Sequence, residues 1–352
     1  MKQKRIADYG IKIGRMRRGE RNKISDVPGV KVGHSTIRDE KHNTGVTVIL
    51  PTKGNIFRDK LVAASFVHNG FGKTAGTVQI DELGTLETPI ALTNTLNVGL
   101  VADGIVQYMT ERCAEDGISL ASINPVVGEC NDAALNTITD RPVTAAHVRE
   151  AVDTAEADFA EGNIGAGAGT QCYGLKGGIG SASRIVELDG KPYTVGVLVQ
   201  SNYGATGDLM INGKPVGQDI SKWIREQECD KGSIIVVLAC DVPLTARQLK
   251  RVIRRCSVGI ARLGSYIGHG SGEVFIGFST ANVIDPCESD IMQISCVRED
   301  KLNLLFRAAG EATEEAILNS MVCAEETRAL NGNMIRSLGD YLDGRWNTDE
   351  QN

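Results

Sequence analysis

One dipeptide in the sequence, Gly232-Ser233, has the residue types to cut its own chain. Gly-Ser begins at four positions, 180, 232, 264 and 270, so the dipeptide alone carries little information. Only at 232 does a polar segment end and a strand-like apolar run, SIIVVLAC, begin with the serine as its first residue. The hydroxyl could then attack the preceding carbonyl, with a small glycine allowing the bent geometry. An ordinary polar beginning of a strand is the alternative.

Cleavage there would also give Ser233 a free α-amine. Such an amine has a reference pKa of about 7.7 to 8.0, so it can act as a base beside a hydroxyl that needs one. Ser271 and Glu273 lie two residues apart in a second strand-like run, and alternation puts them on one face. Side by side they could relay and orient a proton for a nucleophile on a neighbouring strand. A turn serine and an exposed edge carboxylate are the alternative.

Two further polar residues follow apolar runs. Asn202 ends VLVQSN and could offer amide donors to a developing oxyanion, although asparagine at a strand end is also a common turn former. Glu129 follows the apolar run of PVVGE and could bind the ammonium group of a substrate by a charge-assisted hydrogen bond. A solvated loop acid is the alternative for Glu129.

Composition limits the class of protein. The 352 residues carry a formal net charge of −6 and are 41% apolar, which predicts a packed soluble protein whose partner is neither nucleic acid nor membrane. No signal peptide and no run of about 18 apolar residues is present, so we expect a cytoplasmic protein. Nine cysteines without a Cys-x-x-Cys pair or histidines at zinc spacing predict reduced thiols and no metal. We expect a small-molecule substrate and no cofactor.

Strand and helix patterns alternate along the chain and indicate one α/β unit without a linker. The strand-like runs are 45–51, 122–127, 193–202, 233–240 and 273–280, and the helical patterns are 97–112, 144–159, 244–262, 301–322 and 324–342. Such strands would position each of the polar residues above at or near a strand end.

Two segments have unusual composition. Residues 162–183 are rich in glycine, but they follow a helical pattern instead of a strand, which disfavours a dinucleotide-binding loop. A loop whose backbone approaches a site or another segment closely is the better interpretation. Residues 203–232 are polar and predict an exposed connector that would tolerate a chain break.

Several motifs together resemble the family of the L-aminopeptidase D-Ala-esterase/amidase and the β-peptidyl aminopeptidases. In chain order they are ISDVPGVKVGHSTI (24–37), GVTVILP (45–51), PVVGECND (125–132), CYGLKGGIGSASR (172–184), VLVQSNYG (197–204), KGSIIVVLACDVPL (231–244) and GSGEVFIGFSTAN (270–282). They span nearly the whole chain in the order of the family, and the cleavage site is among them.

This resemblance implies a four-layer αββα sandwich, similar to N-terminal nucleophile hydrolases but with a distinct connectivity. It implies a single domain that is cut into residues 1–232 and 233–352, which associate with each other and then into a homotetramer. It also implies that Ser233 is the nucleophile, that Ser271 and Glu273 assist it, and that Asn202 supplies the oxyanion hole. Glu129 would hold the free amine of a small peptide, amino-acid amide or ester, and no cofactor or metal is implied.

The chain departs from some members of that family at Asn131. Those members carry a tyrosine at this position, two residues after the acid, where it helps to stabilise the oxyanion. Either the Asn131 amide substitutes for it or the oxyanion hole is built differently. The sequence leaves the preference for L-, D- or β-amino acids open. Two rival functions are an acyltransferase like the similarly folded ornithine acetyltransferases, which Ser233 disfavours because those enzymes use threonine, and an unprocessed binding protein.

Overall fold

Two β-sheets packed face to face form the centre of the molecule, a computed structural model that describes residues 3–224, 232–284 and 290–346. Sheet A has the order β1-β2-β5-β6, and sheet B has the order β4-β3-β14-β13-β10-β9. The strands of sheet A are β1 (Lys31–Arg38), β2 (Asn43–Leu50), β5 (Ile90–Asn94) and β6 (Val126–Cys130). Those of sheet B are β3 (Lys60–Gly70), β4 (Thr85–Leu86), β9 (Gly178–Leu188), β10 (Lys191–Asn202), β13 (Gly232–Cys240) and β14 (Ser271–Ile284).

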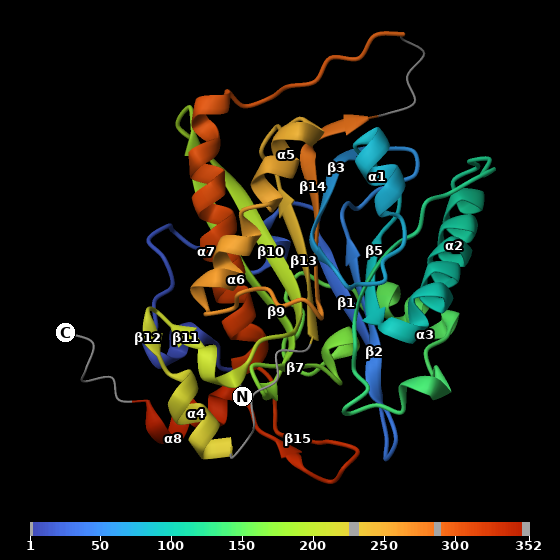
Figure 1. The fold of residues 1–352 in the computed structure, drawn as a ribbon. Helices are drawn as coiled ribbons and strands as arrows, with labels where there is room; N and C mark the ends of the chain where they lie inside the picture. The colour runs from blue at the N-terminus through green and yellow to red at the C-terminus, as the bar shows by residue number, and fades with distance from the viewer. Residues whose placement is uncertain (1–2, 225–231, 285–289, 347–352) are drawn as a thin grey trace.

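Helices cover the outer face of each sheet, as Figure 1 shows. Sheet A carries α2 (Val98–Glu115) and α3 (Ala145–Asp153), and sheet B carries α5 (Ala246–Ile253), α6 (Cys256–Arg262) and α7 (Leu302–Val322). The remaining helices and short strands are α1 (Thr77–Leu83), α4 (Gly217–Ile224), α8 (Leu338–Arg345), β7 (Gln171–Cys172), β8 (Leu175–Lys176), β11 (Met210–Ile211), β12 (Lys214–Pro215), β15 (Thr327–Arg328) and β16 (Met334–Ile335). The expected αββα sandwich is confirmed.

The central strand β13 is buried on both faces, which explains its continuous apolar run. Ile235 and Val237 lie in the core between the sheets, whereas Ile234 and Val236 lie in the core beneath α7. Alternation along β13 therefore separates two cores. Its second residue, Ser233, is therefore held in place, because moving the strand would expose apolar surface of both cores.

Most of the expected elements are confirmed. The strands at 45–51, 193–202, 233–240 and 273–280 correspond to β2, β10, β13 and β14, and the helices at 97–112 and 301–322 correspond to α2 and α7. The run 122–127 becomes a strand only from Val126 onward, directly after Pro125, which has no N–H to donate to a ladder. The pattern 244–262 is broken into α5 and α6.

Two expected helices were wrong over much of their length. The pattern 144–159 ends as α3 at Asp153, because Glu156 pairs with Val32 on the edge of sheet A. The pattern 324–342 is mainly the hairpin β15-β16, and α8 begins only at Leu338. Asn331-Gly332, with a left-handed φ of 86° at the glycine, forms the hairpin turn that helical periodicity had hidden.

The glycine-rich segment approaches other backbone closely, as expected, but its second half is the strand β9 instead of a loop. A Cβ on Gly180 would lie 2.1 Å from the Ala316 carbonyl oxygen of α7. A Cβ on Gly178 would lie 2.2 Å from the carbonyl oxygen of Gly162. Glycine thus lets α7 and the loop before β9 pack directly on the main chain of the strand.

The expected exposed connector at 203–232 was wrong over its described part. Tyr203, Leu209, Ile211 and Ile220 are buried in the core beneath α7, and α4 follows them. A few apolar side chains in this otherwise polar segment are enough to pack it against the rest of the protein. Residues 225–231, which complete the connector, lie outside the described part of the chain.

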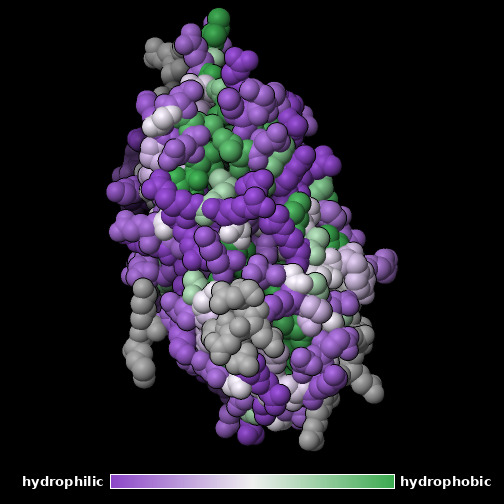
Figure 2. Space-filling view, turned by 90° about the vertical axis from the view of Figure 1, so that its left-hand side faces the viewer, coloured by the Kyte–Doolittle hydropathy of each residue, from purple (hydrophilic) through white to green (hydrophobic). Residues whose placement is uncertain are grey.

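Figure 2 shows that the face seen there is mostly hydrophilic, with apolar side chains gathered in patches. Among residues 3–224, 232–284 and 290–346, no helix has the length and apolarity that a bilayer crossing requires.

Candidate active site

Ser233 lies between two neighbouring strands at the beginning of β13. Its register partner on the antiparallel strand β10 is Asn202, and its partner on the parallel strand β14 is Gly272. The serine is 6% exposed. The end of β10 and the beginnings of β13 and β14 therefore meet at one edge of sheet B, which brings three of the candidate residues or their sequence neighbours together.

Gly232 is required by space. A Cβ on this residue would lie 1.7 Å from the carbonyl oxygen of Asn202, which no side chain could tolerate without moving a strand. The glycine thus allows the bond before Ser233 to lie directly against the end of β10. The expected cleavage bond is thus packed against the main chain of Asn202 and Tyr203.

Ser271 and Glu273 form a buried pair. The Ser271 hydroxyl donates to Glu273 Oε1, and the glutamate is fully buried. The Asn69 amide of β3 donates to the Ser271 carbonyl oxygen and, at 2.9 Å, to that of Gly268, which fixes the turn into β14. A hydroxyl that donates to a carboxylate in a dry environment can pass a proton toward it or hold it in one orientation.

Register also tells on which side of the strands this pair lies. Ser271 is opposite Gly232, and Glu273 is opposite Ile234. By alternation, the Ser271 and Glu273 side chains are on the face of Ile234, and the Ser233 side chain is on the face toward sheet A. The main chain of Ser233 lies between the pair and the hydroxyl.

The Asn202 carboxamide is oriented by the glycine-rich loop. Its Oδ1 accepts a hydrogen bond from the Gln171 main-chain N–H at 2.9 Å. Because the oxygen is engaged, the two N–H donors of the carboxamide point to the other side of the group. In this orientation the two N–H donors are available to form hydrogen bonds with an oxyanion.

Glu129 lies at the corresponding end of sheet A and is 1% exposed. Its Oε1 accepts from the Lys73 main-chain N–H at 2.8 Å, and its Oε2 accepts from the Thr95 hydroxyl. Burial raises the pKa of Glu129, while the bonds from Thr95 and Lys73 oppose that shift. Within the described ranges no lysine or arginine side chain forms an ion pair with this carboxylate, so it can accept the charge of a ligand.

Asn131 is exposed and belongs to the same end of sheet A. Its Nδ2 donates to Thr95 Oγ1 at 3.3 Å, and its Oδ1 accepts from the Ala133 main-chain N–H at 3.1 Å. Thr95 therefore joins Asn131 to Glu129. In this structure the Asn131 amide supports the acid through a shared hydroxyl.

The two sheet ends adjoin each other through glycines and one thiol. A Cβ on Gly272 would lie 2.7 Å from the Gly72 nitrogen, and a Cβ on Gly72 would lie 3.8 Å from Glu129 Oε1. The Cys130 thiol, on the residue after Glu129, lies 3.4 Å from the Ser233 carbonyl oxygen. The ends of sheets A and B thus adjoin each other along one seam at Ser233, and the Ser271–Glu273 pair lies on the other face of sheet B.

Sequence reasoning missed Thr95, Lys73 and Asn69. Thr95 directly follows β5, whose last residue, Asn94, pairs in parallel with Cys130 of β6. The rule that pointed to Glu129, a polar residue at the end of an apolar strand, could have found Thr95 as well. Lys73 contributes its main-chain N–H, and the Asn69 side chain donates to main-chain carbonyl oxygens. Only the fold brings these two residues near the site.

Among the described residues, no group of three or more histidine, cysteine, aspartate or glutamate side chains is arranged to hold a metal ion. The described cysteines are free thiols, and burial raises the pKa of the Cys130 thiol well above its ordinary value, which makes it inert.

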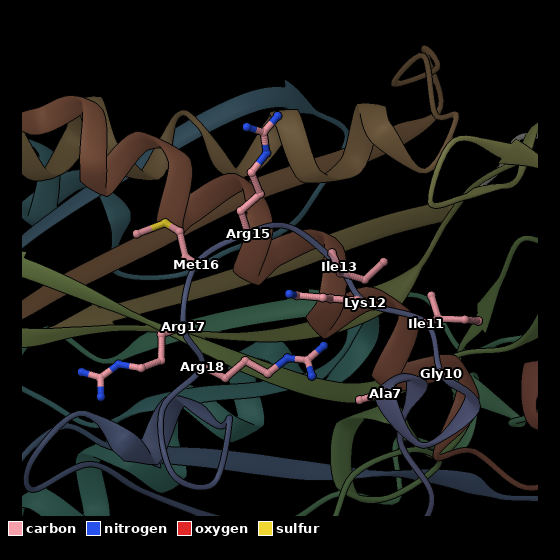
Figure 3. Close-up of a pocket in the computed structure, with 9 residues that line it drawn as sticks. All are labelled: Ala7, Gly10, Ile11, Lys12, Ile13, Arg15, Met16, Arg17 and Arg18. Atoms are coloured by element: carbon pink, nitrogen blue, oxygen red, sulfur yellow. The ribbon is translucent and has the colours of Figure 1, made fainter. Parts of the chain in front are cut away.

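A separate cavity of about 560 Å³ lies under the N-terminal segment, and none of the candidate residues lines it. Figure 3 shows that residues 10–18 bend around it and carry Lys12, Arg15, Arg17 and Arg18. Arg18 is paired with Glu315 of α7 at 2.9 Å. This cavity is thus lined by basic side chains, in contrast to the seam, which contains the buried carboxylate of Glu129.

A serine at the beginning of a central strand in an αββα sandwich is the arrangement of N-terminal nucleophile hydrolases. Comparison with known proteins agrees and specifies the class: the chain belongs to peptidase family S58, whose model matches residues 22–335.

The chain is 39% identical to the β-peptidyl aminopeptidase BapA of Sphingosinicella microcystinivorans, over 95% of this chain and 89% of that protein. Among solved structures, it is similar to the PH0078 protein of Pyrococcus horikoshii OT3, with a TM-score of 0.91, 45% identity and coverage of 97% and 98% of the two chains. It is also similar to the L-aminopeptidase D-Ala-esterase/amidase of Ochrobactrum anthropi, a variant of the Ntn hydrolase fold, with a TM-score of 0.88, 36% identity and 95% coverage of each chain. The protein is thus a serine aminopeptidase, which sets aside the acyltransferase and the binding protein.

Proposed function

We propose that this chain is the uncut precursor of an aminopeptidase that cleaves itself between Gly232 and Ser233. The observation that carries the proposal is the position of Ser233, held by register between Asn202 and Gly272 with the Ser271–Glu273 pair on the opposite face. Residues 1–232 and 233–352 would remain associated, because β13 pairs with β10 of the larger fragment. The single αββα domain would survive the cut.

Cleavage would begin with attack of Ser233 Oγ on the Gly232 carbonyl carbon. The Asn202 donors would stabilise the negative charge that forms on the carbonyl oxygen. The peptide C–N bond then breaks, the acyl group passes to the hydroxyl as an ester, and water hydrolyses that ester to leave a Gly232 carboxylate and a Ser233 α-amine. The proton of the attacking hydroxyl passes to the leaving nitrogen, one water proton returns to Ser233 Oγ, and the proton of the new Gly232 carboxyl group is taken up by the amine or by solvent.

The new amine would then serve catalysis. It would accept the proton of the Ser233 hydroxyl as the hydroxyl attacks a substrate carbonyl, and it would return the proton to the leaving amine. Because the main-chain nitrogen lies between the hydroxyl and the Ser271–Glu273 pair, the pair is suited to orient and tune this amine. Water would release the acyl group in the second half of the cycle.

Glu129 would hold the free amine of the substrate. Glu129 is a buried carboxylate with two fixed donors and, among the described residues, no ion pair to a lysine or arginine, so it has the charge and the preorganisation for an ammonium. Substrates would be short peptides, amino-acid amides or esters with a free N-terminus. The names of the relatives cover β-, L- and D-residues, and a panel of amino-acid p-nitroanilides of all three kinds would rank them for this protein.

The direct test is to purify the wild type and Ser233→Ala and to determine intact masses. The wild type should yield two fragments, 1–232 and 233–352, and Ser233→Ala one inactive chain. Ser265→Ala, which changes a different Gly-Ser dipeptide, is the matched control and should be cut normally. An active wild type with one unbroken chain would sink the proposal.

We also propose that the cut enzyme is a homotetramer, as the family resemblance implies, and that it is cytoplasmic, as we expect from the sequence. Light scattering during gel filtration of wild type should give a mass of four fragment pairs. A monomeric pair with full activity would contradict this part of the proposal alone.

A further inference from the structure

Lys176 is a buried lysine that forms no ion pair among the described residues. It is fully buried, and its ammonium donates to three main-chain carbonyl oxygens: Gly167 at 3.1 Å, Thr170 at 2.7 Å and Gly177 at 3.0 Å. Among the described residues it forms no ion pair, in contrast to buried Arg184, which lies 2.7 Å from Glu315. Burying an ammonium is unfavourable, so a buried lysine without an ion pair calls for a reason other than filling space.

The surroundings of Lys176 oppose its charge. Burial lowers the pKa of Lys176 to about 7, and Arg38 adds to the shift, whereas Asp132 and Cys172 oppose it. A methionine would fill the same volume without this conflict. What the ammonium provides, and methionine cannot, is a positive charge at the point where the three carbonyl oxygens converge.

A tight hairpin places Lys176 at that point. Tyr173 and Gly174 have left-handed φ values of 51° and 70°, which turns β7 back into β8 after two residues. Lys176 then pairs with Gln171 in register. Main-chain hydrogen bonds between β7 and β8 thus fix Lys176 relative to Gln171 and to Thr170, the residue before it.

One peptide group connects the lysine to the candidate oxyanion residue. The Thr170 carbonyl oxygen accepts from Lys176 Nζ at 2.7 Å, and the Gln171 N–H of the same peptide group donates to Asn202 Oδ1 at 2.9 Å. In a trans peptide the C=O and N–H point in opposite directions, so the group passes orientation from one side to the other. A cation at the oxygen polarises the group, and hydrogen bonds in such a chain strengthen one another.

We propose that Lys176 is a positioning residue for Asn202: through the Thr170–Gln171 peptide group, its ammonium orients and polarises the Asn202 carboxamide so that the amide donors face the oxyanion. This inference rests on the proposed role of Asn202 in the reaction. It assigns to the CYGLKGG segment the task of holding the oxyanion donor. The lysine itself touches neither substrate nor nucleophile.

The test is a double-mutant cycle with Lys176→Met, Asn202→Ala and the double variant. We expect Lys176→Met to lower kcat on an amino-acid p-nitroanilide by about 10- to 100-fold with little change in KM, since it weakens one oxyanion donor. In the Asn202→Ala background the same change should lower kcat by less than about twofold. Equal losses in both backgrounds would overturn the proposal. If a variant is cut too slowly to give mature enzyme, the cycle is run on the rate of Gly232–Ser233 cleavage instead of kcat.

Lys23→Met is the matched control. Lys23 also donates to a main-chain carbonyl oxygen, that of Phe159, but in a loop that does not contact Asn202. Its loss should affect kcat little, and equally in both backgrounds. If Lys23→Met couples to Asn202→Ala as strongly as Lys176→Met does, the effect is general loosening and the proposal fails.

A measurement without turnover separates this inference from the proposed function. In the Ser233→Ala chain, the Asn202 side-chain amide protons are observed by NMR, and Lys176→Met or Lys176→Gln should move them upfield because the carboxamide loses polarisation. Unchanged resonances in whichever variant folds would overturn the inference. If Asn202→Ala leaves cleavage and kcat intact, the oxyanion role of Asn202 fails, and the NMR comparison still decides what Lys176 does.

Discussion

The two sheet ends that meet at the seam use the same chemical pair in different settings. In sheet B the Ser271 hydroxyl donates to Glu273, and in sheet A the Thr95 hydroxyl donates to Glu129. Glu273 is enclosed within the strand layer, whereas Glu129 belongs to the edge strand β6 and takes a further bond from the Lys73 N–H. The enclosed pair is suited to handle a proton, and the edge pair is suited to hold a charge.

The comparison predicts the largest effect for Glu273→Gln. The proposed pair loses its charge, so kcat should fall by about 10²- to 10⁴-fold, the range for general acid–base groups. Intact mass determines separately whether the chain is still cut. If Ser271 and Glu273 act as one unit, Ser271→Ala, Glu273→Gln and the double variant should lose similar activity. Additive losses would show that the hydroxyl and the carboxylate work independently.

Glu129→Gln should act on binding instead. The substrate ammonium loses a charged partner, which costs about 2 to 3 kcal/mol, so KM should rise about 30- to 150-fold with kcat much less affected. Because burial raises the pKa of Glu129, the wild-type KM should rise as pH falls at less acidic values than for an ordinary carboxylate. Glu129→Gln should lack this rise. A loss confined to kcat would erase the distinction between the two sheet ends.

Asp132, which follows Glu129 and Asn131, tests how far burial at the end of sheet A destabilises an ionised carboxylate. Burial raises its pKa to about 6, against bonds from Thr44, Asn136 and Asn94. The unfolded value is about 3.9, so its stabilising contribution is complete below pH 4 and is lost as pH rises through 6, by about 2 to 3 kcal/mol. An asparagine side chain cannot ionise, so Asp132→Asn should gain stability relative to wild type between pH 4 and 7 in urea unfolding. If the free energies of unfolding of the two proteins change in parallel with pH, the raised pKa of Asp132 is contradicted.

Thr95→Val should have the smallest effect. It keeps the shape of the side chain and removes one hydrogen bond to Glu129, worth about 1 kcal/mol, so KM should rise about fivefold. Thr95→Ser retains the hydroxyl and should match wild type. An effect on kcat as large as that of Glu273→Gln would mean that the edge pair also takes part in proton transfer.

Sequence reasoning found most of the strand-end residues because they follow a local rule. Apolar runs with a polar residue at one end predicted that Ser233 and Asn202 lie at strand ends, whereas Glu129, expected after the strand, lies within β6. It failed where local patterns compete: the turn at Asn331-Gly332 was hidden by helical spacing, and buried Leu209 and Ile220 were hidden in a polar segment. Short apolar spacings do not distinguish a docked segment from an exposed one.

By itself, the sequence determined which residues could react and on which strand each would stand, because alternation and apolar runs are properties of neighbouring residues. It determined the Ser271–Glu273 pair in this way, since two residues on one strand share a face. Only the tertiary structure decided that Thr95 serves Glu129, that Lys176 reaches Asn202 through a peptide group, and that both sheet ends meet at Ser233. Those contacts depend on strand order and on the packing of two sheets, and residues distant along the chain carry no local signal of either.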